Sequence, residues 1–214
     1  MNACTTELQD AAKLFDKLID GDEEGCRGLV AEFLTEGGTS VVSICEVVTE
    51  AFYKVGDAWE CDQISIYREH IASQIGYRLL QDVRSSLASP DEDAPVAIGC
   101  TPERDPYSLP TCMVELVLRD AGWNAHALGT NLPLTELIPA IDHYKPRLCW
   151  VSASYTESPN RLRDQLLNLL EAGRIRNANV VCGGRAIPED ILKDSSVCYL
   201  GSLRELQQHV TDTT

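Results

Sequence analysis

The sequence predicts an α/β protein with an N-terminal all-α domain, in which a four-helix bundle precedes a doubly wound, five-stranded parallel sheet. Residues 5–88 repeat apolar side chains at helical spacing, whereas after residue 96 short apolar runs alternate with helical stretches. The segment between them is acidic and contains two prolines. We therefore expect a helical domain at 1–88, a linker at 89–95 and a Rossmann-like domain at 96–214.

Four amphipathic helices are expected in the first domain, the last of them at about 64–87. Thr6 and Asp22 are predicted N-caps, and Gly21 and Gly37-Gly38 are predicted helix ends. Short loops between amphipathic helices favour an antiparallel bundle. The predicted buried faces are Leu8, Ala11, Ala12, Phe15, Leu18 and Ile19; Cys26, Leu29, Val30, Phe33 and Leu34; Ile44, Val47, Val48, Ala51 and Val55; and Ile71, Ile75, Leu79 and Val83.

The second domain is expected to be a parallel sheet with helices on both faces, because its strands alternate with helices. Such sheets bind ligands beyond the carboxyl ends of their strands. The loops to consider are therefore 101–110, 129–133, 152–158 and 183–187. The expected strands are 96–100, 124–129, 148–152, 180–182 and 197–200, and the expected helices are about 112–121, 134–143 and 162–172 and one at the C-terminus.

Composition excludes several classes of protein. Lys plus Arg is 18 and Asp plus Glu is 33, so the net charge is −15, which disfavours direct binding to nucleic acid or anionic lipid. No apolar run approaches the roughly 20 residues of a membrane span, and the N-terminus does not resemble a signal peptide. The nine cysteines show no zinc-site spacing, so we expect reduced thiols in a cytoplasmic protein.

One candidate site lies where the third predicted helix meets the fourth. Trp59 is followed, after nine intervening residues, by Glu69 and His70. These three side chains could form a lid with one flat apolar surface and two polar groups. They could equally be a core tryptophan, a solvated glutamate and a hydrogen-bonded core histidine, and the residues alone favour this structural interpretation.

The second candidate site comprises the strand-end loops. The loop 101–110 holds three prolines and could be either a rigid connection or a platform for a bulky ligand. Ser152 and Ser154 offer hydroxyls, and Gly183-Gly184 would let a flat ligand approach the backbone, although Gly-Gly after a strand is more often a simple turn. The sequence contains no dinucleotide, phosphate-loop or nucleophile-elbow motif.

The order of a helical bundle, an acidic proline-containing linker and an α/β domain resembles the cobalamin-binding module. Residues 55–59 and 64–73 are similar to the cap of adenosylcobalamin-dependent photoreceptor regulators, in which the Trp covers the upper ligand and the Glu helps to hold the adenosyl group. Residues 122–123, 128–133 and 183–184 match the family's sheet domain. The resemblance implies that the helical cap covers the upper face of a corrin ring and that the strand ends receive its lower face.

The resemblance assigns cofactor binding to a defined set of side chains and shifts the preference toward the lid interpretation. Adenosylcobalamin is the cofactor form that the cap favours. The implied cofactor-binding residues are Trp59, Glu69, His70, Asp105, Tyr107, Ser108, Thr130, Asn131, Ser152, Ser154, Gly183 and Gly184.

Two departures from the family pattern concern cobalt. The lower-face signature Asp-x-His-x-x-Gly appears here as residues 105–110, with Tyr107 at the His position and Pro110 at the Gly position. Glu60 stands where light-sensing members have a second His. A phenol, which titrates near pH 10, is a poor cobalt ligand beside neutral imidazole. The metal ligand is therefore left unassigned, and we expect weaker binding than in members with the lower His.

The expected function is a cytoplasmic cobalamin-binding sensor or regulator, not an enzyme, which could respond to light and act through a protein partner. The chain shows no N-terminal basic winged helix of the kind found in the photoreceptors, and it could form a homo-oligomer. The alternatives are a corrinoid methyl carrier that serves a methyltransferase, or a scaffold that binds another tetrapyrrole or no cofactor.

Overall fold

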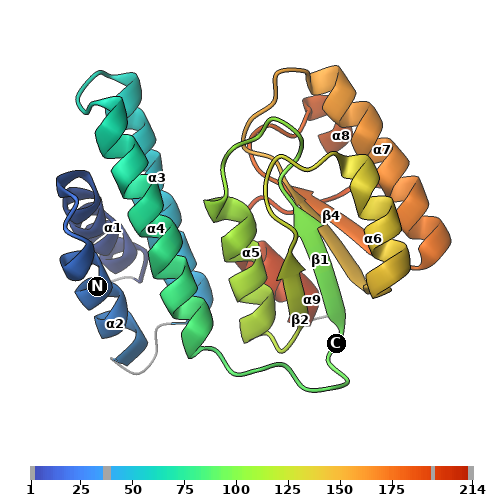
Figure 1. Cartoon of the computed structure of the whole chain (residues 1–214), viewed down its shortest axis with the longest axis horizontal. Helices are drawn as coiled ribbons and strands as arrows, with labels where there is room; N and C mark the ends of the chain where they lie inside the picture. Colours follow the sequence, from blue (N-terminus) through green and yellow to red (C-terminus); the bar gives the residue numbers. More distant parts are fainter. Residues whose placement is uncertain (1–2, 36–39, 194–195, 212–214) are drawn as a thin grey trace. The chain divides into compact units, whose positions relative to one another are not determined.

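A computed structural model describes residues 3–35, 40–193 and 196–211 of the chain (Figure 1). The chain forms two compact units, Met1–Leu87 and Ala88–Thr214, here called the helical unit and the sheet unit. The helical N-terminal region and the parallel sheet confirm the predicted fold class. Within the described ranges, no helix combines the length and apolar character that a membrane span requires.

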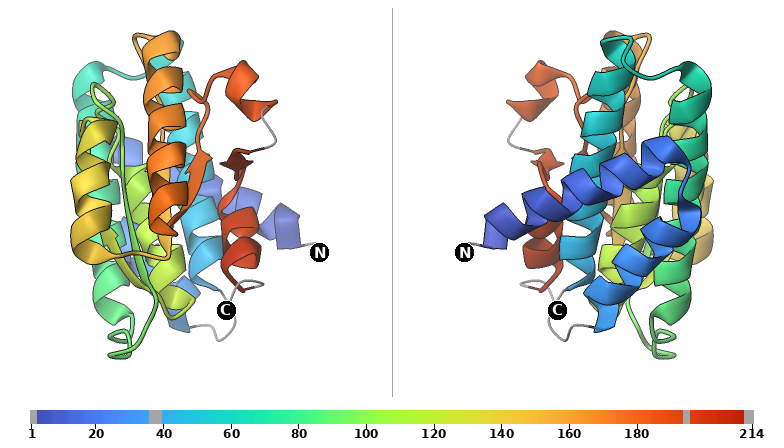
Figure 2. Two further views of the ribbon diagram at one scale, coloured as in Figure 1. Left: turned by 90° about the vertical axis from the view of Figure 1, so that its right-hand side faces the viewer. Right: turned by 90° about the vertical axis from the view of Figure 1, so that its left-hand side faces the viewer.

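The helical unit contains α1 (Ala3–Asp20), α2 (Glu23–Thr35), α3 (Val41–Glu60) and α4 (Ile66–Ser86). Figure 2 shows α1 running obliquely across the other helices of this unit. Gly21 ends α1 with φ of 71°, and Asp22 Oδ1 accepts the N–H of Gly25 at 2.9 Å, as its predicted N-cap role requires. Thr6 lies inside α1 and is not its N-cap, and Gly37-Gly38 fall outside the described residues.

The core of the helical unit agrees with the predicted faces on α3 but differs at several other positions. All five predicted residues of α3 are buried. On α1, however, Leu8 is exposed and Leu14 is buried, because the buried stripe runs along the face that Leu14 shares with Ala11 and Leu18. Leu34 near the end of α2 and Ile71 on α4 are also exposed, and a Cβ built at Gly21 would lie 3.6 Å from Ile71 Cγ2.

The sheet unit is doubly wound, with strand order β2-β1-β3-β4-β5 and parallel pairing throughout. From β1 the chain proceeds outward to β2, then returns to place β3 on the other side of β1. The elements are β1 (Val96–Cys100), α5 (Leu109–Asp120), β2 (Asn124–Ala127), η1 (Leu134–Glu136), α6 (Leu137–Tyr144), β3 (Leu148–Ser152), α7 (Pro159–Arg176), β4 (Asn179–Gly183), α8 (Glu189–Leu192), β5 (Cys198–Tyr199) and α9 (Leu203–Thr211).

Helices cover both faces of this sheet, with α5 and α9 on one side and α6 and α7 on the other (Figure 1). The central strands β1 and β3 are buried on both sides, which explains why they appear in the sequence as continuous apolar runs. The second strand ends at Ala127, two residues earlier than predicted, and α8 was not predicted. The order of strands places the topological switch point, where doubly wound sheets bind ligands, between β1 and β3.

Trp150 occupies the α5 side of β3 and requires a glycine on the neighbouring strand. Gly99 is its register partner on β1, and a Cβ built at Gly99 would lie 2.1 Å from Trp150 Cδ2. The indole is buried, and its Nε1 donates a hydrogen bond to Thr111 Oγ1 on α5 at 3.0 Å. The indole therefore fixes α5 against β1 and β3.

Replacing Gly99 with Ala is expected to destabilise the sheet unit by about 1–3 kcal/mol, the usual range for an overpacked core. The added methyl group would overlap the Trp150 ring, which is held by Thr111 and cannot move aside freely. Urea unfolding followed by circular dichroism measures the change in free energy.

Gly28→Ala on the exposed side of α2 is the matched control, because no atom lies within 4 Å of a Cβ built there. Alanine inside a helix is favoured over glycine by about 0.5–1 kcal/mol, so this variant should be at least as stable as the parent protein. A Gly99→Ala protein with unchanged stability would show that the indole is not held against β1.

Candidate functional site

A buried carboxylate joins the two loops at the switch point of the sheet. Asp105, in the loop after β1, is fully buried. Its Oδ1 accepts the N–H of Tyr107 at 3.1 Å, and its Oδ2 accepts the N–H groups of Ser154 (2.6 Å) and Tyr155 (3.0 Å) in the loop after β3. One side chain therefore determines the separation of the loops that follow β1 and β3.

The same contacts show how the sheet unit uses Asp105. Burial raises the pKa of this carboxyl group, and the N–H donors of Tyr155, Tyr107 and Ser154 oppose that rise. Its oxygens are directed at backbone donors of the protein itself. Although the sequence analysis expects Asp105 to bind a cofactor, the geometry assigns it the role of holding the two loops together.

Asn131 links the loop after β1 to the loop after β2 by a side-chain hydrogen bond. Its Oδ1 accepts the N–H of Arg104 at 2.7 Å, and both residues have positive φ, 56° and 68° respectively. The pairing of β1 with β2 continues beyond the strands, since the N–H of Thr101 donates to Gly129 O at 3.0 Å and that of Leu132 donates to Thr101 O at 3.1 Å. Thr130, another predicted site residue, lies half-buried in this connected segment.

Ser152 is the predicted site residue whose surroundings most clearly suggest a ligand. It ends β3 on the same side as Trp150 and is only 7% exposed. Within the described parts of the chain its hydroxyl has no hydrogen-bond partner, and because that oxygen is not among the fully buried polar atoms that lack one, it is accessible from outside the sheet unit. Ser154 and Ser108 are partly exposed in the adjacent loops.

The two predicted glycines are explained by packing inside the sheet unit. Gly184 has φ of 99°, and a Cβ built there would lie 2.2 Å from the carbonyl oxygen of Ala153. A Cβ at Gly183 would lie 2.8 Å from Leu200 O. Both glycines therefore allow neighbouring backbone segments to approach each other, and this internal packing accounts for them without a flat ligand.

Tyr107 and Tyr155 expose their side chains beside Asp105. Tyr107 is 47% exposed and Tyr155 is 45% exposed, while their backbone N–H groups are both bonded to the Asp105 carboxylate. Tyr155 was not among the predicted site residues. Its only sequence signal was its place in the loop 152–158, because nothing in the spacing connects it with Asp105.

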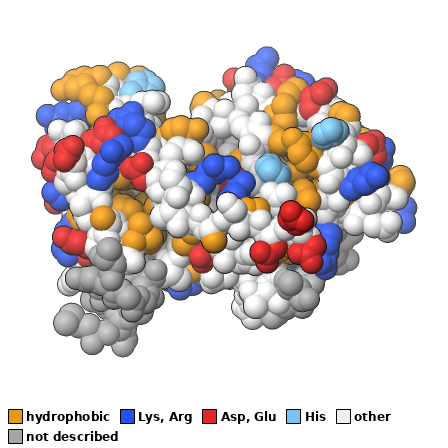
Figure 3. All heavy atoms as spheres, turned by 60° about the horizontal axis from the view of Figure 1, so that its bottom comes forward, with side chains coloured by type: hydrophobic (Ala, Val, Ile, Leu, Met, Phe, Trp, Pro, Cys, Tyr) orange, Lys and Arg blue, Asp and Glu red, His pale blue; other side chains and the backbone are white. Residues whose placement is uncertain are grey.

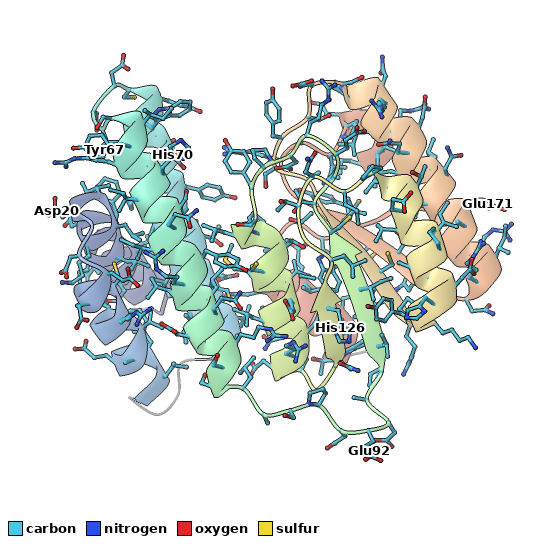
Figure 4. The ribbon with its side chains drawn as sticks, in the orientation of Figure 1. Asp20, Tyr67, His70, Glu92, His126 and Glu171 are labelled. Carbon is cyan, nitrogen blue, oxygen red and sulfur yellow. The ribbon has the colours of Figure 1, made fainter. Side chains whose placement is uncertain are left out.

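On the helical unit, the candidate residues lie on either side of the turn between α3 and α4. Trp59, in the last turn of α3, is 43% exposed. Glu69 Oε1 accepts the Ser73 hydroxyl at 2.8 Å, and Glu69 Oε2 lies 3.3 Å from His70 Nδ1. His70, labelled in Figure 4, has a side chain that is 71% exposed, so it is not the core histidine of the structural interpretation.

The Glu69 carboxylate thus accepts the Ser73 hydroxyl with one oxygen and places the other 3.3 Å from Nδ1 of the exposed His70 ring, which orients the imidazole. A half-exposed indole and an oriented imidazole can contact a large ligand with both apolar and polar surface. Within the described residues, His, Cys, Asp and Glu side chains nowhere form a group of three that could hold a metal ion. A bound metal would therefore have to bring most of its ligands with it.

Replacing Asp105 with Ala should destabilise the sheet unit by about 1–3 kcal/mol, because N–H donors in two loops lose their acceptor. Asp105→Asn should lower the free energy of unfolding by less, since the amide oxygen can still accept hydrogen bonds from the loop after β3. Asp91→Ala, at an exposed position before β1, is the control and should leave the free energy of unfolding unchanged. Equal stability of the Asp105→Ala and Asp91→Ala proteins in urea would contradict the tethering role.

Comparison with known proteins finds similarity to B12-binding domains and corrinoid proteins. Residues 11–81, most of the helical unit, match the family model described as B12 binding domain. The chain is 24% identical over 184 residues to trimethylamine corrinoid protein 1 of Methanosarcina acetivorans, covering 84% of each chain. It is 26% identical over 133 residues to the HTH-type transcriptional repressor CarH of Myxococcus xanthus, covering 59% of this chain and 42% of that protein.

Among solved structures, the monomethylamine corrinoid protein of Methanosarcina barkeri has the same fold. The TM-score is 0.74 with 19% sequence identity, and the match covers 94% of this chain and 97% of that one. The family match agrees with the resemblance found in the sequence, and the five-stranded parallel sheet agrees with the predicted fold class. Residues 11–81 of the helical unit therefore match a B12 binding domain, and the chain shares the fold of the monomethylamine corrinoid protein, in which a helical region precedes a Rossmann-like domain.

Proposed function

We propose that this protein binds a corrinoid and acts as a sensor or regulator through a protein partner. The observation that carries the proposal is the helical unit, which matches the B12 binding domain and exposes Trp59 and the Glu69–His70 pair at one end. Exposing an indole and an oriented imidazole to water gives no folding advantage, whereas both can contact a ligand. A corrin ring with its amide side chains offers complementary apolar and polar surface.

The sheet unit supports the same proposal through its strand-end loops. The Ser152 hydroxyl, which has no partner within the described residues, is available to a polar atom of the cofactor, and Tyr107, Ser108, Thr130 and Ser154 lie in the loops that follow β1, β2 and β3. Asp105 and Asn131 hold these loops in place. Cobalamin, when bound, would supply a cobalt centre with an exchangeable and light-sensitive upper ligand.

Adenosylcobalamin is the form that we propose for the sensor. Trp59 can cover an upper adenosyl group, and Glu69 can accept hydrogen bonds from its ribose hydroxyls. We further propose that the protein is not an enzyme and that it acts in the cytoplasm. The eight cysteines whose side chains the structure describes are all free thiols. A protein partner is proposed because corrinoid proteins and regulators work through other proteins.

Direct contact with nucleic acid is not part of this proposal. The net charge of −15 opposes it. On the face drawn in Figure 3, Lys and Arg side chains are scattered among acidic and neutral ones and form no continuous basic area. A regulatory output would therefore pass through a protein.

A corrinoid methyl carrier is the second candidate function. It is favoured by the match to the trimethylamine corrinoid protein, which covers 84% of both chains. Tyr107 at the position of the lower His opposes it, because a methyl carrier cycles cobalt through a low-valent state with a protein ligand that leaves and returns. A scaffold that binds another tetrapyrrole, or no cofactor, is the remaining alternative.

Absorption spectra separate these functions. The protein is mixed with adenosyl-, methyl- and hydroxocobalamin in the dark and then illuminated. The sensor predicts preference for the adenosyl form and a spectral change on illumination. Methyl transfer after reduction would favour the carrier, and unchanged spectra with all three forms would contradict corrinoid binding.

Trp59→Ala is expected to weaken binding of adenosylcobalamin by about tenfold and to leave hydroxocobalamin binding nearly unchanged, because only the former has a large upper group to cover. Equilibrium dialysis in the dark measures both affinities. Tyr53→Ala is the control, since Tyr53 is an exposed aromatic residue on the same helix. Equal losses for the two cofactor forms would assign Trp59 a purely structural role.

Tyr107→His should tighten cobalamin binding and shift its spectrum toward a form in which a protein imidazole is bound to cobalt. The position lies beside Asp105 at the switch point, and neutral imidazole is a far better cobalt ligand than a phenol. Spectra and affinity that do not change from the parent protein would show that residue 107 does not face the cobalt.

A further inference from the structure

We propose that Tyr107 and Tyr155 form a paired aromatic surface that receives the cofactor's own benzimidazole base, so that the chain selects cobalamin with this base on cobalt. The inference rests on the proposed function and names the form of the ligand. It is carried by the placement of the two tyrosines around Asp105 and by the positions of the histidines.

Asp105 holds the two tyrosines close together. The N–H of Tyr107 donates to Oδ1 at 3.1 Å, and that of Tyr155 donates to Oδ2 of the same carboxylate at 3.0 Å. The two backbone segments are therefore separated by little more than one carboxylate group. They also belong to the loops after β1 and β3, which border the switch point of the sheet.

Both rings are available to a ligand. About half of each side chain is exposed, at 47% for Tyr107 and 45% for Tyr155. In the portion of the chain that the structure describes, neither ring contacts another aromatic ring, whereas Tyr144 on α6 contacts His126 and His143. Two tyrosines whose backbone N–H groups share one carboxylate and whose rings do not stack on each other can flank a planar heteroaromatic group.

The strand-end loops provide no imidazole for cobalt. The four histidines of the chain are His70, His126, His143 and His209. His126 lies within β2 (Figure 4), His143 lies near the end of α6 and His209 lies in α9, so none of these three follows a strand of the sheet at its carboxyl end. His70 belongs to the helical unit.

The pair of exposed tyrosines and the lack of a histidine in the strand-end loops are complementary features. A corrinoid that kept its own base on cobalt would need no protein ligand on its lower face, and the base would project from that face as a flat apolar ring. Tyr107 and Tyr155 offer aromatic surface at the place where such a ring would arrive. The tyrosine that replaces the histidine therefore serves a different mode of binding from the one in which a protein imidazole holds cobalt.

The first test compares cobalamin with cobinamide, which has the same corrin ring but lacks the base. The parent protein should bind hydroxocobalamin about tenfold or more tightly than diaquocobinamide, and Tyr107→Ala and Tyr155→Ala should each reduce that preference by about tenfold. Tyr107→Phe and Tyr155→Phe should retain it, because the ring remains. Tyr144→Ala, which removes a partly exposed tyrosine from α6, is the control.

The second test identifies the nitrogen on cobalt. Electron paramagnetic resonance of bound cob(II)alamin should show a three-line splitting from the nitrogen-14 base, even when the protein is uniformly labelled with nitrogen-15. A two-line splitting would mean that a protein nitrogen is the ligand, and loss of the splitting would mean that the base has left cobalt. Either result overturns the inference.

The affinities separate the inference from the proposed function. Equal binding of cobalamin and cobinamide, unaffected by either Ala variant, would overturn the inference and leave corrinoid binding intact. If neither corrinoid binds, the proposed function and the inference both fail. Circular dichroism of each variant verifies that the sheet unit is folded.

Discussion

The sheet unit depends on one buried carboxylate. Asp105 accepts hydrogen bonds from backbone donors in two loops and is a buried tie between the chain segments after β1 and β3. Asn131 adds the loop after β2, and ion pairs Arg104–Glu157 and Arg161–Glu103 join the outer parts of the loops after β1 and β3. Because backbone donors are fixed by the fold, this network holds the loops open in a defined geometry before any ligand arrives.

This network also separates the residues that hold the site from those that are available to a ligand. Asp105, Asn131 and Gly184 are used by contacts inside the sheet unit. The Ser152 hydroxyl, which has no partner within the described structure, and the exposed rings of Tyr107 and Tyr155 remain available. The helical unit shows the same division, since Ser73 and Glu69 orient His70, which is itself exposed.

The sequence predicted the fold class, the order of helices and strands and the turn that carries Trp59, because these follow from apolar periodicity and from turn residues. It failed at Leu8 and Ile71, which lie at the margins of helix faces where a small rotation decides between core and solvent. The role of Asp105 and the presence of Tyr155 could not be predicted. Both depend on hydrogen bonds between residues about fifty positions apart, and such contacts cannot be inferred from spacing along the chain.

Amide hydrogen exchange with and without adenosylcobalamin in the dark tests the central claim most directly, because it reports on each unit separately and does not depend on any substitution. The account predicts slower exchange in residues 101–108 and 153–158 of the sheet unit and in residues 59–70 of the helical unit, with little change in α7 and α9. Unchanged exchange in all of these segments, or protection confined to the amino ends of the strands, would contradict it.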